Sequence, residues 1–256
     1  MFKIQFINNI VFKDGLLYAL DRTDNLTRVF IRQGNLEGRC TIYSLMMMLM
    51  FHKRISREDL LYRVDRNAPS YIKRLKKQLL SSKRRARSLE EMREKLLSSF
   101  ENQISVEVYT LPKYKDYCAN AKCLHNKIKS HLDLGLPVQI SYFFPNEMLG
   151  HSVVVIGYSF CESVIHLYCL DPSIRMVHTT IWNNVIDLNL NYNDSKRMDY
   201  DHMAEKKIFV KGILLIEDTC ISTESIEETP FLPFESKAKD TELPFEPEAK
   251  DTILTF

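Results

Sequence analysis

Glycine is scarce in this sequence, with 7 residues in 256, so each glycine that does occur carries information about a turn. The six cysteines have spacings that suit neither a zinc site nor the dense disulfide framework of a small secreted protein. The longest nearly uncharged run, Cys40 to Phe51, is too short to cross a bilayer, and residues 1–20 lack the continuous apolar stretch of a secretory signal. These absences predict a cytoplasmic protein with reduced thiols and no membrane span.

Apolar residues, by contrast, are sufficient for a sizeable core. Hydrophobic residues make up 45% of the chain, and its 14 Phe and 12 Tyr can furnish a large core or an apolar groove. The formal net charge of +2 hides an asymmetry between the two ends of the chain. Residues 217–256 hold eleven Asp or Glu and three Lys, a net charge of −8, which leaves +10 for residues 1–216. A basic body with an acidic tail is typical of proteins whose tail takes part in an interaction.

The composition divides the chain into a body, residues 1–218, and a tail, residues 219–256. In the tail, a Leu-Pro-Phe-Glu segment starts at Leu232 and again at Leu243, a period of eleven residues. The proline and acid content of the tail predicts disorder. Within the body, residues 60–115 are predicted to form a basic helical insert, in which ten Lys or Arg lie along residues 71–97.

The hydrophobic pattern predicts an α+β fold, with helices first and a mostly antiparallel sheet after them. Cys40–Phe51 is apolar on almost every side and predicts a buried helix. Residues 71–100 predict one long helix or two helices joined near residues 81–82, and a further helix is predicted to end at Gly135. A hairpin is predicted to turn at residues 13–15, and five further runs predict strands, the last of which closes the sheet: 104–110, 138–144, 152–158, 165–170 and 208–216.

Cys40 is the candidate nucleophile. It stands at the start of the predicted buried helix, directly after Gly38 and Arg39. A thiol attacks a carbonyl only as the thiolate, and an unperturbed thiol has a pKa of about 8.5. A helix N-terminus and a neighbouring imidazolium both lower that pKa, so a cysteine at this position is suited to nucleophilic chemistry.

His151 is the candidate base, because it begins the predicted strand 152–158, where its ring can face a groove. Asp171 follows the next predicted strand, 165–170, and precedes Pro172. If the two strands form a hairpin, the end of one lies beside the start of the other, which brings Asp171 to His151. A carboxylate at that place can hold the imidazole by its other nitrogen.

The oxyanion that develops during acyl transfer needs fixed hydrogen-bond donors. Two candidates are the backbone N–H of Cys40 and the side-chain amide of Gln33, seven residues upstream. A site built in this way uses side chains and backbone groups alone, so the sequence predicts neither a cofactor nor a metal ion.

These segments resemble a known family. Gln33, residues 38–40 and the apolar helix after them resemble the nucleophile segment of papain-like cysteine peptidases. Residues 150–158 and the Leu-Asp-Pro-Ser run at 170–173 resemble the histidine strand and aspartate turn of the bacteriocin-processing, C39-like (double-glycine) branch. The resemblance implies a helical half and an antiparallel-sheet half with the site between them. It also implies a thiol peptidase that cleaves a peptide or protein substrate after small residues, with Gln33 in the oxyanion hole.

Two other functions stay open. The transglutaminase branch shares the Cys-His-Asp order, so acyl transfer to an amine is an alternative to hydrolysis. A non-catalytic, peptide-binding module of papain-like fold is the second alternative. Two features favour the binding module. The residue after the cysteine is Thr41, where the C39-like branch usually has a small residue, and the gap between Gln33 and Cys40 is one residue longer than expected.

Three further patterns point to other sites or partners. Cys118 and Cys123, with two nearby histidines at 125 and 131, suggest zinc, but the segment is predicted to be one helix and no second cysteine pair has ligand spacing. The basic residues 71–97 favour a solvated face over nucleic-acid binding, because aromatic residues do not interleave with the charges. The acidic tail is a third candidate partner, since it could dock on residues 71–97 and cover the groove.

Overall fold

The structure is a computed structural model. It describes residues 4–33, 39–61, 68–80, 87–101, 103–111, 117–144, 150–161, 164–176, 178–189, 195–199 and 204–218. The tail predicted to be disordered, 219–256, and two parts of the basic insert, 62–67 and 81–86, lie outside the described residues.

The main sheet has eight strands, and every pairing in it is antiparallel. Six of the strands close into a ring in the order β7, β6, β11, β10, β9, β8, because β8 pairs again with β7. The two remaining strands are β1, which pairs with β7, and β5, which pairs with β11. The bounds are β1 Ile4–Phe6, β5 Ile104–Thr110, β6 Val138–Phe143, β7 Gly150–Cys161, β8 Val164–Leu170, β9 Asn184–Asn189, β10 Ser195–Asp199 and β11 Ala204–Asp218.

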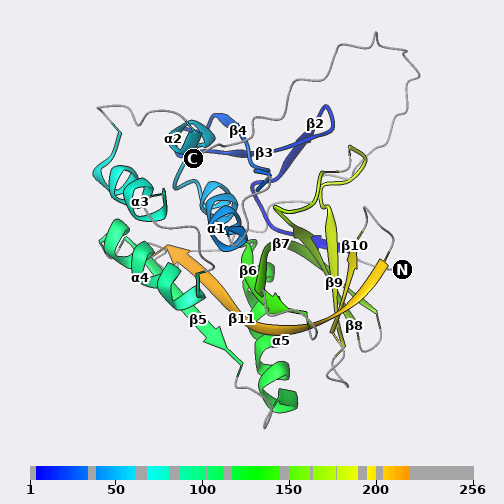
Figure 1. Ribbon diagram of the computed structural model, residues 1–256. Coiled ribbons are helices and arrows are strands. Elements are labelled where there is room, and N and C mark those ends of the chain that lie inside the picture. The colour runs from blue at the N-terminus through cyan, green and yellow to red at the C-terminus, as the bar shows by residue number, and fades with distance from the viewer. Residues whose placement is uncertain are drawn as a thin grey trace, which may run out of the picture.

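The long strand β11 belongs to two regions of the sheet. Its first residues pair with β10, its middle with β6, and Gly212–Asp218 with β5. In Figure 1 it sweeps across the molecule from the ring of strands to the side where α3 (Ser70–Leu80) and α4 (Leu89–Phe100) lie. The strand predicted at 208–216 is therefore present, and it lies between β6 and β10 as one of the six strands of the closed ring.

The helix α1 (Cys40–Phe51) is the centre of the core, and all of its residues are buried. It packs against β6 and β7 on one side and contacts β3 of a smaller sheet. A helix that is apolar all round is stable only where neighbours cover every face, and this arrangement supplies them. The prediction of a buried helix over these residues is confirmed.

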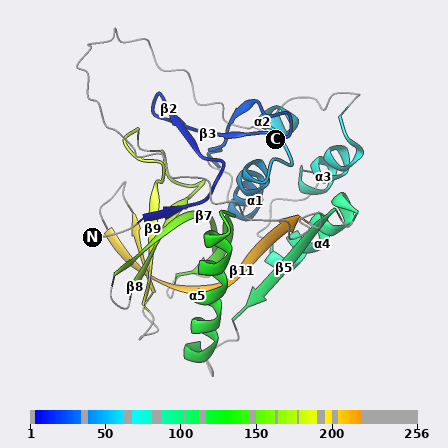
Figure 2. The same cartoon turned by 180° about the vertical axis from the view of Figure 1, so that it is seen from behind.

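The helices predicted within 71–100 and before Gly135 are present. The region 71–100 is two helices, α3 and α4. A short helix α2 (Arg57–Leu61) starts with a capping box, in which the Asp59 N–H donates to Ser56 Oγ at 3.1 Å and the Ser56 N–H donates to Asp59 Oδ2 at 2.8 Å. The fifth helix, α5 (Tyr117–Asp133), is followed by Gly135 at a φ of 76°, and Figure 2 shows it lying across β11.

A second, three-stranded sheet is built from β2 (Val11–Lys13), β3 (Leu16–Leu20) and β4 (Leu26–Arg28). Its first two strands form the hairpin predicted to turn at residues 13–15. The molecule thus has helices and a mostly antiparallel sheet, as predicted for an α+β fold. No helix within the described ranges combines the length and apolarity needed to span a bilayer.

Candidate active site

Cys40 is the first residue of α1, and its side chain reaches the space between this helix and the start of β7. The residue is 5% exposed. The first turn of α1 contains no acidic residue, so nothing there offsets the positive end of the helix dipole. The Arg39 carbonyl accepts the first helical hydrogen bonds, from the Ile42 and Tyr43 N–H groups at 3.0 and 3.1 Å. The helix terminus therefore favours a negative charge at the sulfur.

His151 lies near the start of β7, paired in register with Tyr142 of β6. The two rings meet edge to face, with centroids 5.5 Å apart, which fixes the plane of the imidazole. His151 Nε2 lies 2.8 Å from Asp171 Oδ1. The same imidazole acts on the pKa of the Cys40 thiol, and because Nε2 faces Asp171, the ring nitrogen left for the sulfur is Nδ1.

The thiol has an environment that favours its ionised form. Burial raises the pKa of Cys40, but the hydrogen bond and positive charge of His151, with a hydrogen bond from the Ser152 backbone N–H, lower the pKa below its ordinary value. Burial by itself would lower the pKa of His151. The charge and hydrogen bond of Asp171, with those of Cys40, raise it instead to about 10. The described geometry therefore supports a thiolate–imidazolium pair at neutral pH.

Asp171 is the first residue after β8 and has no exposed surface. Besides His151, its carboxylate accepts hydrogen bonds from the backbone N–H and hydroxyl of Ser173, both to Oδ1, at 2.8 and 2.6 Å. The Asn184 side chain donates to Oδ2 at 3.0 Å. A buried carboxylate with several donors stays in one orientation and can hold the imidazole in one tautomer.

Gln33 lies beside the turn that carries Asp171, because its backbone N–H donates to the Pro172 carbonyl at 2.7 Å. The residue is 9% exposed. The five residues between it and Arg39, which include Gly34 and Gly38, lie outside the described part of the chain. The structure thus joins Cys40, His151 and Asp171 in one chain of contacts and ties the Gln33 backbone to the same turn.

Three polar side chains that the sequence analysis did not single out link α1 to the sheet. Gln139 Nε2 donates to the Thr41 carbonyl and to Ser152 Oγ, each at 2.9 Å. Ser44 Oγ donates to the Ser152 carbonyl at 2.9 Å. All three side chains are fully buried, and Gln139 stands between two apolar residues of its strand, Val138 and Ile140. A polar residue inside a buried strand is a signal that could have found them, since it must have a partner.

The zinc interpretation finds no support among the described side chains, where no group of three or more His, Cys, Asp or Glu could hold a metal ion. The side chain of Cys118 lies outside them, and Cys123 is exposed. His125 and His131 are instead buried, and burial lowers the pKa of each to about 4. These two histidines are therefore neutral side chains of the interior at pH 7.

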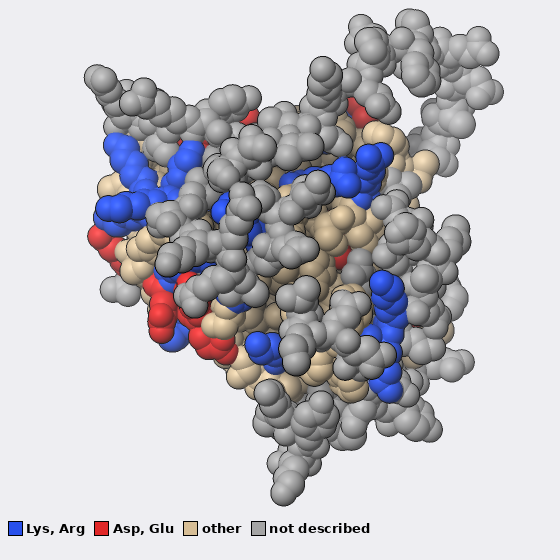
Figure 3. Space-filling view, viewed as in Figure 1, with Lys and Arg blue, Asp and Glu red and all other residues tan. Residues whose placement is uncertain are grey.

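Several basic residues of the insert have structural partners. In Figure 3, Lys and Arg side chains gather over α3, next to Asp and Glu side chains. Arg74 donates to the Ser99 carbonyl at 2.8 Å, and Arg93 donates to the Val106 carbonyl at 3.1 Å. Arg87, whose side chain is buried, pairs with Glu91 at 3.2 Å. These residues hold α3, α4 and β5 together, so the charge of the insert is not all available to a ligand.

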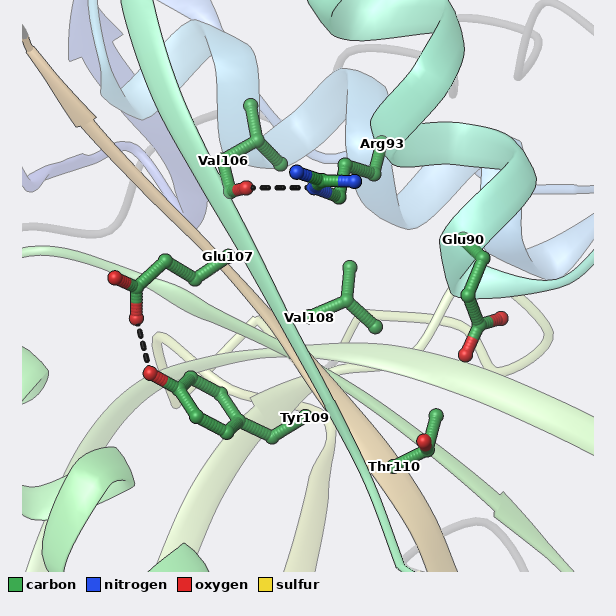
Figure 4. A pocket seen from close by; sticks show the side chains of 7 residues that line it. All are labelled: Glu90, Arg93, Val106, Glu107, Val108, Tyr109 and Thr110. Atoms are coloured by element: carbon green, nitrogen blue, oxygen red, sulfur yellow. Dashed lines mark hydrogen bonds between the residues drawn. The ribbon is translucent and has the colours of Figure 1, made fainter.

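A hollow of about 370 Å³ lies between α4 and β5, lined by Glu90, Arg93 and residues 106–110. Figure 4 shows Arg93 bonded to the Val106 carbonyl above this space, while Glu90 of α4 points toward it. None of the three residues Cys40, His151 and Asp171 lines it. The hollow is separate from the candidate site.

Comparisons with known proteins leave the family open. No protein-family model matches the sequence, and no curated protein matches it. Among solved structures, the chain is similar to UfSP from C. elegans, with a TM-score of 0.43 and 12% sequence identity. The match covers 84% of this chain and 34% of that one, so the chain spans about a third of the length of that structure. The proposal for function therefore rests on the side chains of the site.

Proposed function

We propose that this protein is a cysteine peptidase of papain-like fold, formed by residues 1–218, in which Cys40 is the nucleophile, His151 the base and Asp171 the residue that orients the base. The observation that carries the proposal is that one imidazole serves two partners: His151 lies 2.8 Å from the buried carboxylate of Asp171 and lowers the pKa of the Cys40 thiol, which stands at a helix N-terminus. Each contact stabilises the charged pair that attack on a peptide carbonyl requires.

In this mechanism the Cys40 thiolate attacks the carbonyl carbon of the substrate. The backbone N–H of Cys40 and the amide of Gln33 stabilise the oxyanion. The His151 imidazolium then protonates the leaving amine, and an acyl-enzyme forms on the sulfur. Water, deprotonated by His151, releases the acyl group and restores the thiol.

The substrate class is a peptide or protein, cleaved after small residues as in the C39-like branch that the sequence resembles. The cytoplasmic location belongs to the same proposal. Among the described side chains, four cysteines are free thiols: Cys40, Cys123, Cys161 and Cys169. Free thiols, one of them required for catalysis, suit a reducing compartment.

The reactivity of Cys40 tests the proposal without knowledge of the substrate. We expect iodoacetamide to alkylate Cys40 at pH 6 faster than the exposed Cys123, because an ordinary thiol is only about one part in 300 ionised at that pH. Peptide mapping by mass spectrometry at successive times gives both rates in one sample. A Cys40→Ala variant identifies the modified peptide.

In the Asp171→Asn variant, Cys40 should no longer be alkylated faster than Cys123 at pH 6. An amide does not carry the charge that raises the pKa of His151, so the thiolate should lose its counterion. We expect the alkylation rate at pH 6 to fall by about tenfold or more, with recovery as the pH rises above 8. Equal rates for Cys40 and Cys123 in the wild-type chain would contradict both hydrolysis and acyl transfer, and would leave the peptide-binding module as the better description.

A further inference from the structure

Two adjacent asparagines, Asn183 and Asn184, lie behind the carboxylate of the candidate site. Asn184 is the first residue of β9, and Asn183 directly precedes it. Neither has any exposed surface. The donors and the acceptor of a buried amide need hydrogen-bond partners, so the partners of these two side chains indicate their roles.

Asn183 closes the turn that follows β8. Its Oδ1 accepts from the Asp171 backbone N–H at 2.7 Å. Its Nδ2 donates to the Asp171 carbonyl at 2.8 Å and to the Ile174 carbonyl at 3.0 Å. The turn from Asp171 to Ile174 holds the carboxylate that faces His151, and the Pro172 carbonyl in it accepts from the Gln33 N–H. The Asn183 side chain thus fixes a turn that positions both the Asp171 carboxylate and the backbone of Gln33.

Asn184 acts on the carboxylate itself. Its Nδ2 donates to Asp171 Oδ2, the oxygen that His151 does not use. Its own Oδ1 has no hydrogen-bond partner among the described residues. Turning the amide over would set that oxygen against the carboxylate, so the observed orientation is the one that the charge of Asp171 selects. A buried acceptor without a partner destabilises the fold, and such an atom is expected where a side chain is kept for a site rather than for packing.

We propose that Asn183 and Asn184 are positioning residues of this site: Asn184 holds the carboxylate of Asp171 toward His151, and Asn183 holds the turn that places Asp171 and Gln33 together. The inference rests on the proposed function, since it assigns roles relative to Cys40 and His151. The two residues differ in how many groups of the site depend on them. Loss of Asn184 affects the ion pair alone, whereas loss of Asn183 affects the ion pair and the oxyanion donor.

The test is the pH profile of Cys40 alkylation by iodoacetamide in Asn183→Ala and Asn184→Ala. We expect the ratio of the rate at pH 6 to the rate at pH 9 to fall by about tenfold in each variant, because a thiol with a raised pKa loses more of its ionised form at pH 6 than at pH 9. A purely structural role would lower the thermal midpoint and leave this ratio unchanged in the folded protein.

Asn9 provides a matched control. Its side chain makes the same three kinds of bond, accepting from the Leu20 N–H at 2.7 Å and donating to the Leu20 and Phe51 carbonyls at 3.0 and 2.9 Å. Phe51 is at the opposite end of α1 from Cys40, about 16 Å away along the helix axis. Asn9 also has a φ of 43°, so Asn9→Ala adds backbone strain to the lost bonds. This variant should be destabilised and keep the wild-type pH profile.

The outcomes separate the two proposals. If wild-type Cys40 reacts no faster than Cys123, the proposed function itself fails. If wild-type Cys40 reacts fast and both asparagine variants keep its pH profile, the function stands and the positioning role is refuted. Should Asn183→Ala not fold, Asn184→Ala decides, because it removes one hydrogen bond and leaves the turn closed. A changed profile in Asn9→Ala would also refute the role, since the effect would then be a general one.

Discussion

At the scale of single residues, the proposed mechanism separates groups that ionise the thiol from groups that act on the substrate. His151, Asp171 and the Ser152 N–H lower the pKa of Cys40 before any substrate is present. Gln33 is tied to the same turn but acts only when an oxyanion forms. Alkylation by iodoacetamide forms no oxyanion, so it reports on the first set alone.

Gln33→Ala should therefore affect peptide hydrolysis but not the alkylation of Cys40. We expect peptide hydrolysis to fall by about 10²–10³-fold, the usual effect of removing one oxyanion donor, while the alkylation rate of Cys40 stays at its wild-type value. Hydrolysis of a fluorogenic peptide with small residues at the cleavage site gives the first rate. A parallel loss of alkylation would show that Gln33 supports the ion pair instead.

How far the site could be predicted depends on whether its residues belong to sequence motifs or to long-range contacts. The sequence predicts Cys40, His151 and Asp171 as candidates because helix starts, strand starts and turns after strands are visible in the pattern. It does not predict Asn183 or Gln139. The Asn183 bonds join two strands across a turn, and Gln139 binds the carbonyl of Thr41, 98 residues away. Contacts at that separation leave no local periodicity to detect.

At the scale of secondary-structure elements, the site depends on how α1 is fixed against β6 and β7. The link is polar, through Gln139, Ser152 and Ser44, inside an otherwise apolar interface. We expect Gln139→Leu, which keeps a similar volume, to lower the free energy of unfolding by about 1–3 kcal/mol because the buried Thr41 carbonyl loses the donor that comes from the sheet. Urea denaturation at pH 7 measures this loss.

The same variant should also slow the alkylation of Cys40, since a shift of the first turn of α1 separates the sulfur from His151. Gln78→Leu is a suitable control, because the hydrogen bonds of the Gln78 side chain are to Ser98 and Ser99 of α4, and those to Ser98 are exposed. An unchanged alkylation rate in a destabilised Gln139→Leu variant would restrict Gln139 to a structural role.

Element prediction succeeded where the local pattern is strong. The largely apolar run of α1 predicts its helix, and the runs rich in β-branched residues in β6, β7 and β8 predict these strands. The strands β9 and β10 were missed. The β10 sequence, Ser-Lys-Arg-Met-Asp, lacks alternation and is a strand only because β9 and β11 pair with it on both sides.

At the scale of the whole molecule, buried histidines should make stability depend on pH. Burial lowers the pKa of His52, His125 and His131 to about 4 each, below the ordinary value of about 6.5 that they regain on unfolding. Between these values the unfolded chain binds more protons than the folded one, so stability falls as the pH decreases from about 6.5 to 4.

The midpoint of urea unfolding, measured across this range, checks the expectation. His125→Gln removes one of the three buried histidines and should weaken the dependence of the urea midpoint on pH. The same change at the exposed His178 should leave this pH dependence as in the wild type. A midpoint that stays constant from pH 6.5 to 4.5 would show that these histidines are protonated in the folded state.

The acidic tail is predicted to act on the body as an intramolecular partner. The last described residue, Asp218, pairs with Arg54, whose carbonyl accepts from the Tyr71 hydroxyl of α3 at 3.1 Å, so the described chain ends near this basic helix. We expect deletion of residues 219–256 to raise peptidase activity at low salt and to reduce the effect of added salt. Unchanged activity and salt dependence would remove the docking prediction.

The position of β11 in the chain has a consequence for biosynthesis. It is the last strand of the ring to be synthesised, yet it provides the partner of β6, which in turn holds β7 and His151. A nascent polypeptide that has not reached residue 204 cannot complete the sheet that sets the imidazole against Cys40. On the proposed function, the pair of Cys40 and His151 would therefore form only after β11 has been synthesised.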